Sequence, residues 1–191
     1  MCGMNRLTYT RVWRHSCFVL LVLSLLLPAE LLSAGAVSPE YKLKAALIYK
    51  LTKFVEWPRN SRERKQFGIC ILGRDDFGSA LNALEARQVG NQPIHIQRFA
   101  QSEAVNSSCQ ILFISESKRP FLKTILHSLA PLPILTIGDM GEFAEMGGMI
   151  ELTRGHKRIG FRINLQQADR AGLKIAAPLL DLATIVETIQ P

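Results

Sequence analysis

The first regular pattern of apolar and polar positions along the chain is helical. Ser38, Pro39 and Glu40 supply a capping hydroxyl, a proline suited to the first helical position and an acid for the first turn. Apolar residues then recur at helical spacing with lysines between them: Leu43, Ala46, Leu47, Leu51, Phe54 and Val55 against Lys42, Lys44, Lys50 and Lys53. The pattern predicts an amphipathic helix to about Glu56, ended by Trp57 and Pro58.

The middle of the chain alternates between short apolar runs and amphipathic segments. These predict strands at 67–73, 93–99, 110–115 and 133–138, and helices at 77–87 and 118–129. Continuous apolar runs such as ILFI and ILTI are typical of strands that are covered on both faces, as in parallel sheets.

The last third of the chain has a different pattern. The segments GGMIELTRG and RIGFRIN lie close together and predict an antiparallel hairpin. A helix is expected from about Leu165 to Ala171, ending at Gly172, and Pro178 is expected to open a closing helix over PLLDLATIVETI. The predicted fold is α/β: a single-domain layered sandwich with a mostly parallel sheet flanked by helices and a C-terminal antiparallel hairpin.

Residues 1–36 are set apart by a pattern typical of a secretory signal peptide. Three arginines precede the apolar run CFVLLVLSLLL, and the small residues Ala34, Gly35 and Ala36 follow it. The alternative, a membrane anchor, would need about 20 apolar residues, and this run is too short. We expect cleavage after Ala36, export of the protein and a mature domain at 37–191.

Charge argues against nucleic acid as a partner. Removing Arg6, Arg11, Arg14 and Glu30 with the leader leaves 20 of the 23 basic residues and 15 of the 16 acidic ones. The basic residues are scattered, without a dense tract or interleaved aromatic residues. A solvated basic surface explains them, and a weak anion site is the alternative.

The residues do not form a recognisable catalytic, metal or cofactor motif. The loop from Gly73 to Gly78 reads GRDDFG, which is neither a dinucleotide fingerprint nor a P-loop, and we expect Asp75 or Asp76 to cap the following helix. The histidines after the leader are widely spaced, and His95 lies between two isoleucines, where a strand would point it to solvent. We expect no cofactor, no metal and no enzymatic activity.

Two cysteines, Cys70 and Cys109, remain after the leader is removed. Both lie in or beside strands that are predicted to be neighbours, and an exported protein favours a disulfide between them. Two buried thiols are the alternative. A bridge across 39 residues would contribute roughly 4 kcal/mol of stability by loop entropy.

Taken together, five blocks of the chain resemble the YfiR family of bacterial periplasmic proteins. The blocks are YKLKAALIYKLTKFVEWP, ICILGRDDFG, CQILFIS, ILTIGDMGEFAEMGGMIEL and IGFRINLQQADRAGLKIAAPLLDLA, in the family's order. The resemblance implies a repressor of YfiN, an inner-membrane diguanylate cyclase, with YfiB, an outer-membrane lipoprotein, as the sequestering partner. It implies lower cyclic di-GMP and less biofilm, and it places the family's disulfide on Cys70 and Cys109. A second cysteine pair found in some members would fall on Ala144 and Glu151, so that bridge is absent here.

The C-terminal block from Phe161 to Leu180 is the expected partner surface. Its candidate contact residues are Phe161, Arg162, Asp169, Arg170 and Lys174, with burial in the core as the alternative for each apolar residue. A rival interpretation is a periplasmic binder of a small anion or nucleotide that uses Arg59 and Lys174. Whether the chain forms a homodimer is left open.

Overall fold

The computed structural model describes residues 37–155 and 159–189, so the predicted leader lies outside it and remains a prediction. The helices are α2 (Pro39–Leu51), α3 (Arg59–Arg62), α4 (Ser79–Asn82), α5 (Leu122–Leu129), α6 (Leu165–Arg170) and α7 (Ala177–Leu180), with 3₁₀ turns η1 (Ala83–Ala86), η2 (Ser102–Ala104) and η3 (Glu116–Phe121). The strands are β1 (Val55–Glu56), β2 (Phe67–Leu72), β3 (Gln88–Val89), β4 (Gln92–Phe99), β5 (Cys109–Ile114), β6 (Leu135–Gly138), β7 (Ile150–Arg154), β8 (Ile159–Ile163), β9 (Lys174–Ile175) and β10 (Ala183–Ile185).

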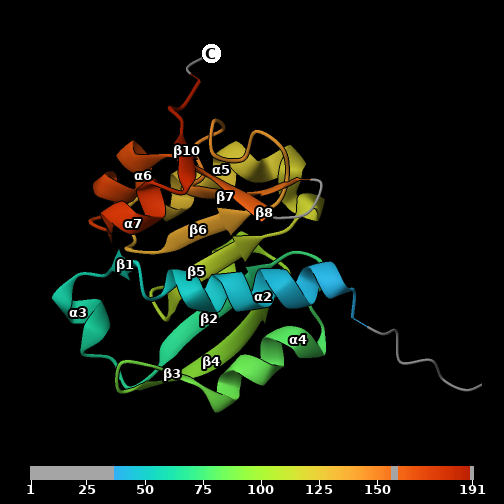
Figure 1. Ribbon diagram of the computed structural model, residues 1–191. Helices are drawn as coiled ribbons and strands as arrows, with labels where there is room; N and C mark the ends of the chain where they lie inside the picture. The colour runs from blue at the N-terminus through green and yellow to red at the C-terminus, as the bar shows by residue number, and fades with distance from the viewer. Residues whose placement is uncertain (1–36, 156–158, 190–191) are drawn as a thin grey trace, which may run out of the picture. The chain divides into compact units, whose positions relative to one another are not determined.

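The predicted fold class is confirmed. Eight of these strands form one sheet in the order β10-β8-β7-β6-β5-β2-β4-β3, with parallel pairing from β4 through β7 (Figure 1). The predicted hairpin is the antiparallel pair β7 and β8. The connecting residues 156–158 lie outside the described part of the chain.

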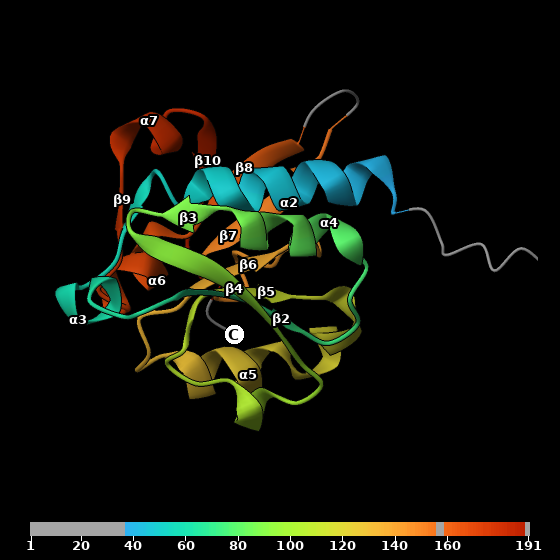
Figure 2. The same ribbon diagram turned by 90° about the horizontal axis from the view of Figure 1, so that it is seen from below.

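Both faces of the sheet are covered, as the continuous apolar runs predicted. Alternate residues such as Ile69, Ile111 and Phe113 pack towards α2 and α4. Their neighbours, such as Leu112 and Ile114, pack towards α5 on the opposite face (Figure 2). The core is therefore divided into two layers by the sheet itself.

Two predicted helices are too long. The first ends at Leu51 and is followed by a turn and then by β1, which pairs with β9 in the register Val55 to Ile175. The closing helix ends at Leu180, and Ala183–Ile185 form β10, parallel to β8. In both cases pairing with a distant strand overrides the local helical pattern.

The helix expected from about Leu165 to Ala171 is α6, whereas two other helix predictions hold in position but not in detail. The helix predicted at 77–87 is the short α4 followed by η1, and the one at 118–129 is η3 followed by α5. The N-cap of α4 is Gly78 and has no side-chain cap, so the predicted aspartate cap is wrong. Asp75 instead accepts hydrogen bonds from the backbone N–H groups of Phe77 and Gly78, in the loop before the helix. His95 is exposed, as predicted.

Cys70 and Cys109 form a disulfide between the neighbouring strands β2 and β5, with Cα atoms 5.8 Å apart. Both residues are buried in the layer under α5. Gly68 lies opposite Cys109, and a Cβ at that glycine would be 2.0 Å from the carbonyl oxygen of Ser108. Close approach of the two strands beside the bridge therefore requires glycine at this position.

Removing the bridge should destabilise the fold strongly. The double variant Cys70→Ala/Cys109→Ala should lose roughly 4 kcal/mol of unfolding free energy, because the unfolded chain is no longer restricted by a 39-residue loop. Urea unfolding of the oxidised parent and the variant measures this loss. A parent with two titratable thiols, or an unchanged midpoint, would contradict the structural role of the disulfide.

Candidate functional site

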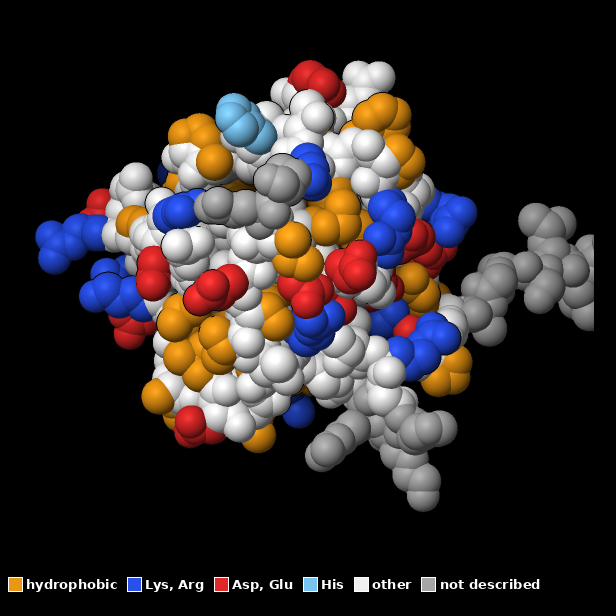
Figure 3. Space-filling view, turned by 90° about the horizontal axis from the view of Figure 1, so that it is seen from above, with side chains coloured by type: hydrophobic (Ala, Val, Ile, Leu, Met, Phe, Trp, Pro, Cys, Tyr) orange, Lys and Arg blue, Asp and Glu red, His pale blue; other side chains and the backbone are white. Residues whose placement is uncertain are grey.

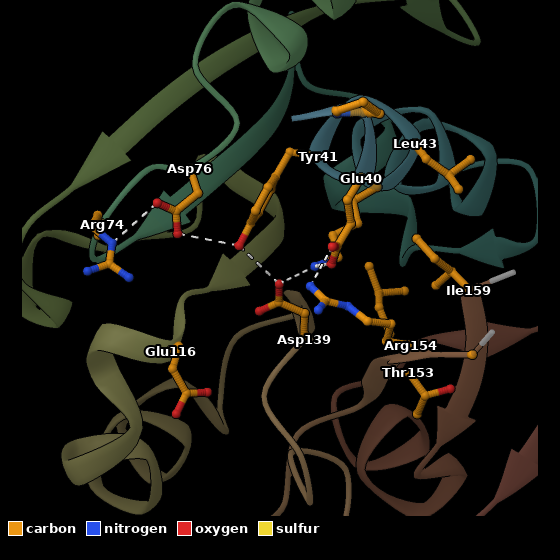
Figure 4. Close-up of a pocket in the computed structure, with 14 residues that line it drawn as sticks. Glu40, Tyr41, Leu43, Arg74, Asp76, Glu116, Asp139, Thr153, Arg154 and Ile159 are labelled. Carbon is orange, nitrogen blue, oxygen red and sulfur yellow. Dashed lines mark hydrogen bonds and ion pairs between the residues drawn. The ribbon is translucent and has the colours of Figure 1, made fainter. Parts of the chain in front are cut away.

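A crevice of about 490 Å³ lies at the edge of the sheet where the parallel strands end (Figure 4). One wall is the first two turns of α2, from Pro39 to Lys44. The other walls come from segments that follow β2, β5 and β6 and from the β7–β8 hairpin. Their lining residues are Arg74, Asp76, Glu116, Asp139, Leu152, Thr153, Arg154, Gly155 and Ile159.

The topology of the sheet explains why a crevice forms here. From β2 the chain continues to β4 on one side, and it then returns to β5 on the other side of β2. The segment after β2 leads to α4 and the segment after β5 leads to α5, which cover opposite faces. The two loops diverge at the carboxyl ends of these strands, which is the place where open α/β sheets usually bind ligands.

Lys44 is the most deeply buried charge in the crevice. It is only 5% exposed, and its Nζ lies 2.6 Å from Glu40 Oε1 and 2.5 Å from Asp139 Oδ2. The ammonium also lies 4.5 Å from the centre of the Tyr41 ring. A buried ion pair of this kind is stable only when both charges stay paired.

The Tyr41 hydroxyl lies between two carboxylates. Its oxygen is 3.3 Å from Asp139 Oδ2 and 3.4 Å from Asp76 Oδ2. Burial raises the pKa of this phenol well above its usual value, and the charges of Asp139 and Asp76 raise it further. The hydroxyl therefore stays protonated, and it has a single proton for two acceptors.

Two arginines form the rim of the crevice. The Arg154 guanidinium pairs with Glu40, and the hydrogen bond from Arg154, followed by that from Lys44, lowers the pKa of the Glu40 carboxyl. Arg74 Nε lies 3.2 Å from Asp76 Oδ1. The side chains of Arg74 and Arg154 are 70% and 78% exposed, so both are accessible from solvent.

The helical pattern of α2 did not reveal this site. It placed Leu43 on the apolar face and Lys44 between apolar positions, whereas Leu43 is 47% exposed and Lys44 is buried. Two features of the sequence could have pointed to the site. Glu40 and Lys44 have the i,i+4 spacing that favours an ion pair, and Asp139 comes directly after the strand that ends at Gly138. Neither signal shows that the two segments meet.

The residues predicted to bind a partner fall into two groups. Phe161 is half-buried against the core, so its burial agrees more with the core alternative. Arg162 is also half-buried and forms ion pairs with Glu145 and Glu151. Asp169, Arg170 and Lys174 are exposed.

The residues predicted to bind an anion lie near an acid. Lys174 is paired in register with Glu56 across the β1–β9 ladder, and Arg59 follows at the start of α3. Arg59, Lys174 and Glu56 are exposed. An anion bound by Lys174 would therefore have a carboxylate as its neighbour.

Ala144 and Glu151, where the resemblance would place a second cysteine pair, lie next to each other. The backbone N–H of Ala144 donates to Glu151 Oε2 at 3.2 Å. Glu151 also lies 3.7 Å from Arg162 Nη1. Where a second bridge would lie, this chain has a buried carboxylate with a hydrogen bond and an ion pair.

A comparison with known protein families matches residues 41–184 to the family described as YfiR/HmsC-like. The chain belongs to the YfiR/HmsC-like family. Membership supports a periplasmic regulator at the level of the family and confirms the resemblance seen in the sequence. Within residues 37–155 and 159–189, the structure contains no helix long and apolar enough to cross a bilayer.

Two solved structures share the fold of this YfiR/HmsC-like chain at low sequence identity. A conserved domain protein from Vibrio cholerae O1 biovar eltor str. N16961 matches with a TM-score of 0.55 and 12% identity, over 78% of this chain and 60% of that one. The ABC domain from Streptococcus pneumoniae in complex with L-Trp matches with a TM-score of 0.51 and 11% identity, over 76% and 60%. The chain thus aligns with about three fifths of each structure, and the likeness concerns the fold.

Replacing Lys44 should be far more harmful than replacing a neighbouring lysine. Lys44→Met leaves Asp139 and Glu40 without their shared cation, and we expect a loss of about 3 kcal/mol in unfolding free energy. Lys42→Met, at an exposed position of the same helix, should change it by no more than about 0.5 kcal/mol. Urea unfolding of both variants measures the difference, and equal midpoints would contradict the role of the buried pair.

Tyr41 should make the protein sensitive to alkali. Because its pKa is raised in the folded state, stability is complete below the usual tyrosine value of about 10 and falls as the pH rises above it. Thermal unfolding between pH 9 and 11 should show this fall in the parent and a smaller one in Tyr41→Phe. Identical pH profiles would show that the phenol is not held neutral by its surroundings.

Proposed function

We propose that this protein represses an inner-membrane diguanylate cyclase of the YfiN type by binding its periplasmic sensor region. Binding would lower cyclic di-GMP and biofilm formation, and a YfiB-like outer-membrane lipoprotein would sequester the repressor. The family match over residues 41–184 is the observation that carries the proposal. The proposal includes export of the protein by means of the predicted leader at residues 1–36.

The surface proposed for the cyclase is formed by α6 and β9. Asp169, Arg170 and Lys174 are exposed there, and none of them forms an ion pair with another described residue. Such charges belong to the polar rim of an interface. Phe161 and Arg162 lie on β8 and are half-buried, so we propose a supporting role for them and not a direct contact with the partner.

The side of the molecule on which β10 lies has the mixed character of a protein-binding surface. Apolar side chains lie there among charges of both signs (Figure 3). Three large apolar residues of the C-terminal segment are exposed: Leu182, Ile185 and Ile189. On such a surface the apolar side chains can be buried at the centre of a protein interface, and the charged side chains can surround them.

The rival function, anion binding through Arg59 and Lys174, has less support. Glu56 lies opposite Lys174 in the β1–β9 ladder and would oppose a bound anion. The family match also favours a regulator. The regulatory function is therefore the one we propose.

Reversing the rim charges should weaken capture of the cyclase without unfolding the protein. Asp169→Lys/Lys174→Glu preserves net charge but inverts the local pattern, so the affinity for the cyclase's periplasmic domain should fall at least about tenfold. Surface changes of this type should leave the thermal midpoint nearly unchanged. Biolayer interferometry with the purified domain measures the affinity.

A matched control is available in Glu103→Lys/Lys65→Glu, which reverses one exposed charge of each sign on other segments of the chain. The control should bind like the parent. If the Asp169/Lys174 variant also binds like the parent, this surface is not the interface. If the oxidised parent does not bind any cyclase periplasmic domain from its own cell, the repressor function itself is contradicted.

A further inference from the structure

We propose that a hollow at the amino ends of β2 and β5 is a binding site for an anionic group of the phosphate type. The hollow has a volume of about 330 Å³ and lies at the opposite end of the strands from the crevice around Lys44. The inference goes beyond repression of a cyclase and does not depend on it. It rests on the charges that line the hollow, on their lack of ion-pair partners and on the space left by a glycine.

Three segments of the chain form the walls of the hollow. The turn before β2 contributes basic residues, and both β4 and the loop before β5 contribute polar ones. The lining includes Arg64, Lys65, His95, Gln97, Asn106 and Ser108.

Gly68 leaves the floor of the hollow free of a side chain. Its Cα is in register with His95 on one side and with Cys109 on the other. Although β2 lies between β4 and β5 in the sheet, the Gln97 amide donates to the Ser108 hydroxyl oxygen at 3.3 Å. A Cβ at position 68 would lie 2.0 Å from the Ser108 carbonyl oxygen. The floor is therefore backbone, with polar side chains on both sides of it.

The charged groups that line the hollow are basic. Arg64, Lys65 and His95 line it, and none of the described residues in its lining is an acid. Neither Arg64 nor Lys65 forms an ion pair with another described residue. Arg64 is half-buried, so its side chain is partly withdrawn from water. Because basic groups without counter-charges in a concave site concentrate anions, the hollow selects an anionic ligand.

This lack of acids distinguishes the hollow from the other basic positions of the molecule. In the crevice, Lys44, Arg74 and Arg154 each pair with an acid already. Lys174 lies opposite Glu56 in the β1–β9 ladder. An anion at either of those places would displace or oppose a carboxylate, whereas the lining of the hollow presents none to it.

His95 can add a further donor to the hollow. Glu85, which does not belong to the lining, has its Oε1 3.6 Å from His95 Nδ1 and accepts from the backbone N–H of Ile96 at 3.2 Å. The strand itself thus holds Glu85 beside the ring, where it contacts only one of the two ring nitrogens. The other nitrogen, Nε2, has no hydrogen bond to a described residue and is left for a ligand.

The neutral donors favour a phosphate-type group. Gln97, Asn106 and Ser108 supply amide and hydroxyl groups beside the Arg64 guanidinium, which has the fork of N–H donors that matches phosphate oxygens. The volume of about 330 Å³ is within the range of small-molecule sites, so a polar body such as a sugar can accompany the anion. Inorganic phosphate and a phosphorylated sugar are therefore the two sources of this group that have to be distinguished.

The test is calorimetric titration of the purified, oxidised protein with glucose 6-phosphate, inorganic phosphate and glucose, in a buffer free of other phosphate and sulfate. Glucose 6-phosphate should bind at least about tenfold more tightly than glucose, equivalent to about 1.4 kcal/mol. Tighter binding of glucose 6-phosphate than of phosphate would identify a sugar phosphate as the source, and equal or weaker binding would identify the bare ion. Equal binding of glucose 6-phosphate and glucose, or no binding of either anion at millimolar concentration, would overturn the proposal.

Variants locate the bound anion. Arg64→Gln should weaken binding of the tighter anion about tenfold, because it removes a charged donor. Lys65→Gln, at an exposed position, should weaken it about threefold, and it keeps the test open if Arg64→Gln does not fold. The matched control, Arg59→Gln/Lys174→Gln, removes two exposed bases outside the hollow and should bind like the parent. Unchanged affinity in both hollow variants, or a loss confined to the control, would show that the hollow is not the site.

Discussion

The contact on which the crevice depends is the buried ion pair between Lys44 and Asp139. It joins the first turns of α2 to the segment that follows β6, at a place where both side chains are almost fully removed from water. Glu40 extends the pair on one side, and Tyr41 extends it on the other. Because none of these groups can be buried alone without a large cost, the helix must lie in one position across the strand ends.

That position has consequences for the rest of the domain. With α2 fixed, Ala45, Ile48 and Leu51 fill the layer above the sheet, while α5 and the disulfide fill the layer below it. The interior is thus apolar on both sides of the strands, and charged groups gather where the strands end. The same arrangement leaves a crevice with polar groups on its floor and Leu43 at its side.

The sequence predicted what depends on local pattern and failed where distant segments meet. The buried strands and the β7–β8 hairpin followed from runs of apolar residues, and the Cys70–Cys109 bridge followed from compartment and strand neighbourhood. The β1–β9 and β10–β8 pairings could not be predicted, because residues 52–56 and 181–189 have a helical pattern by themselves. The helical pattern groups Lys44 with the other lysines of α2 and does not reveal its burial, because only the fold brings Asp139 next to it.

Membership of the YfiR/HmsC-like family supports a periplasmic regulator at the level of the family. The measurement that tests the regulatory account most directly is the cellular concentration of cyclic di-GMP. Loss of this chain should raise it, restoration of the full chain should lower it again, and restoration of a chain without residues 1–36 should not. An unchanged concentration on loss of the chain, in cells that contain the membrane cyclase, would contradict repression.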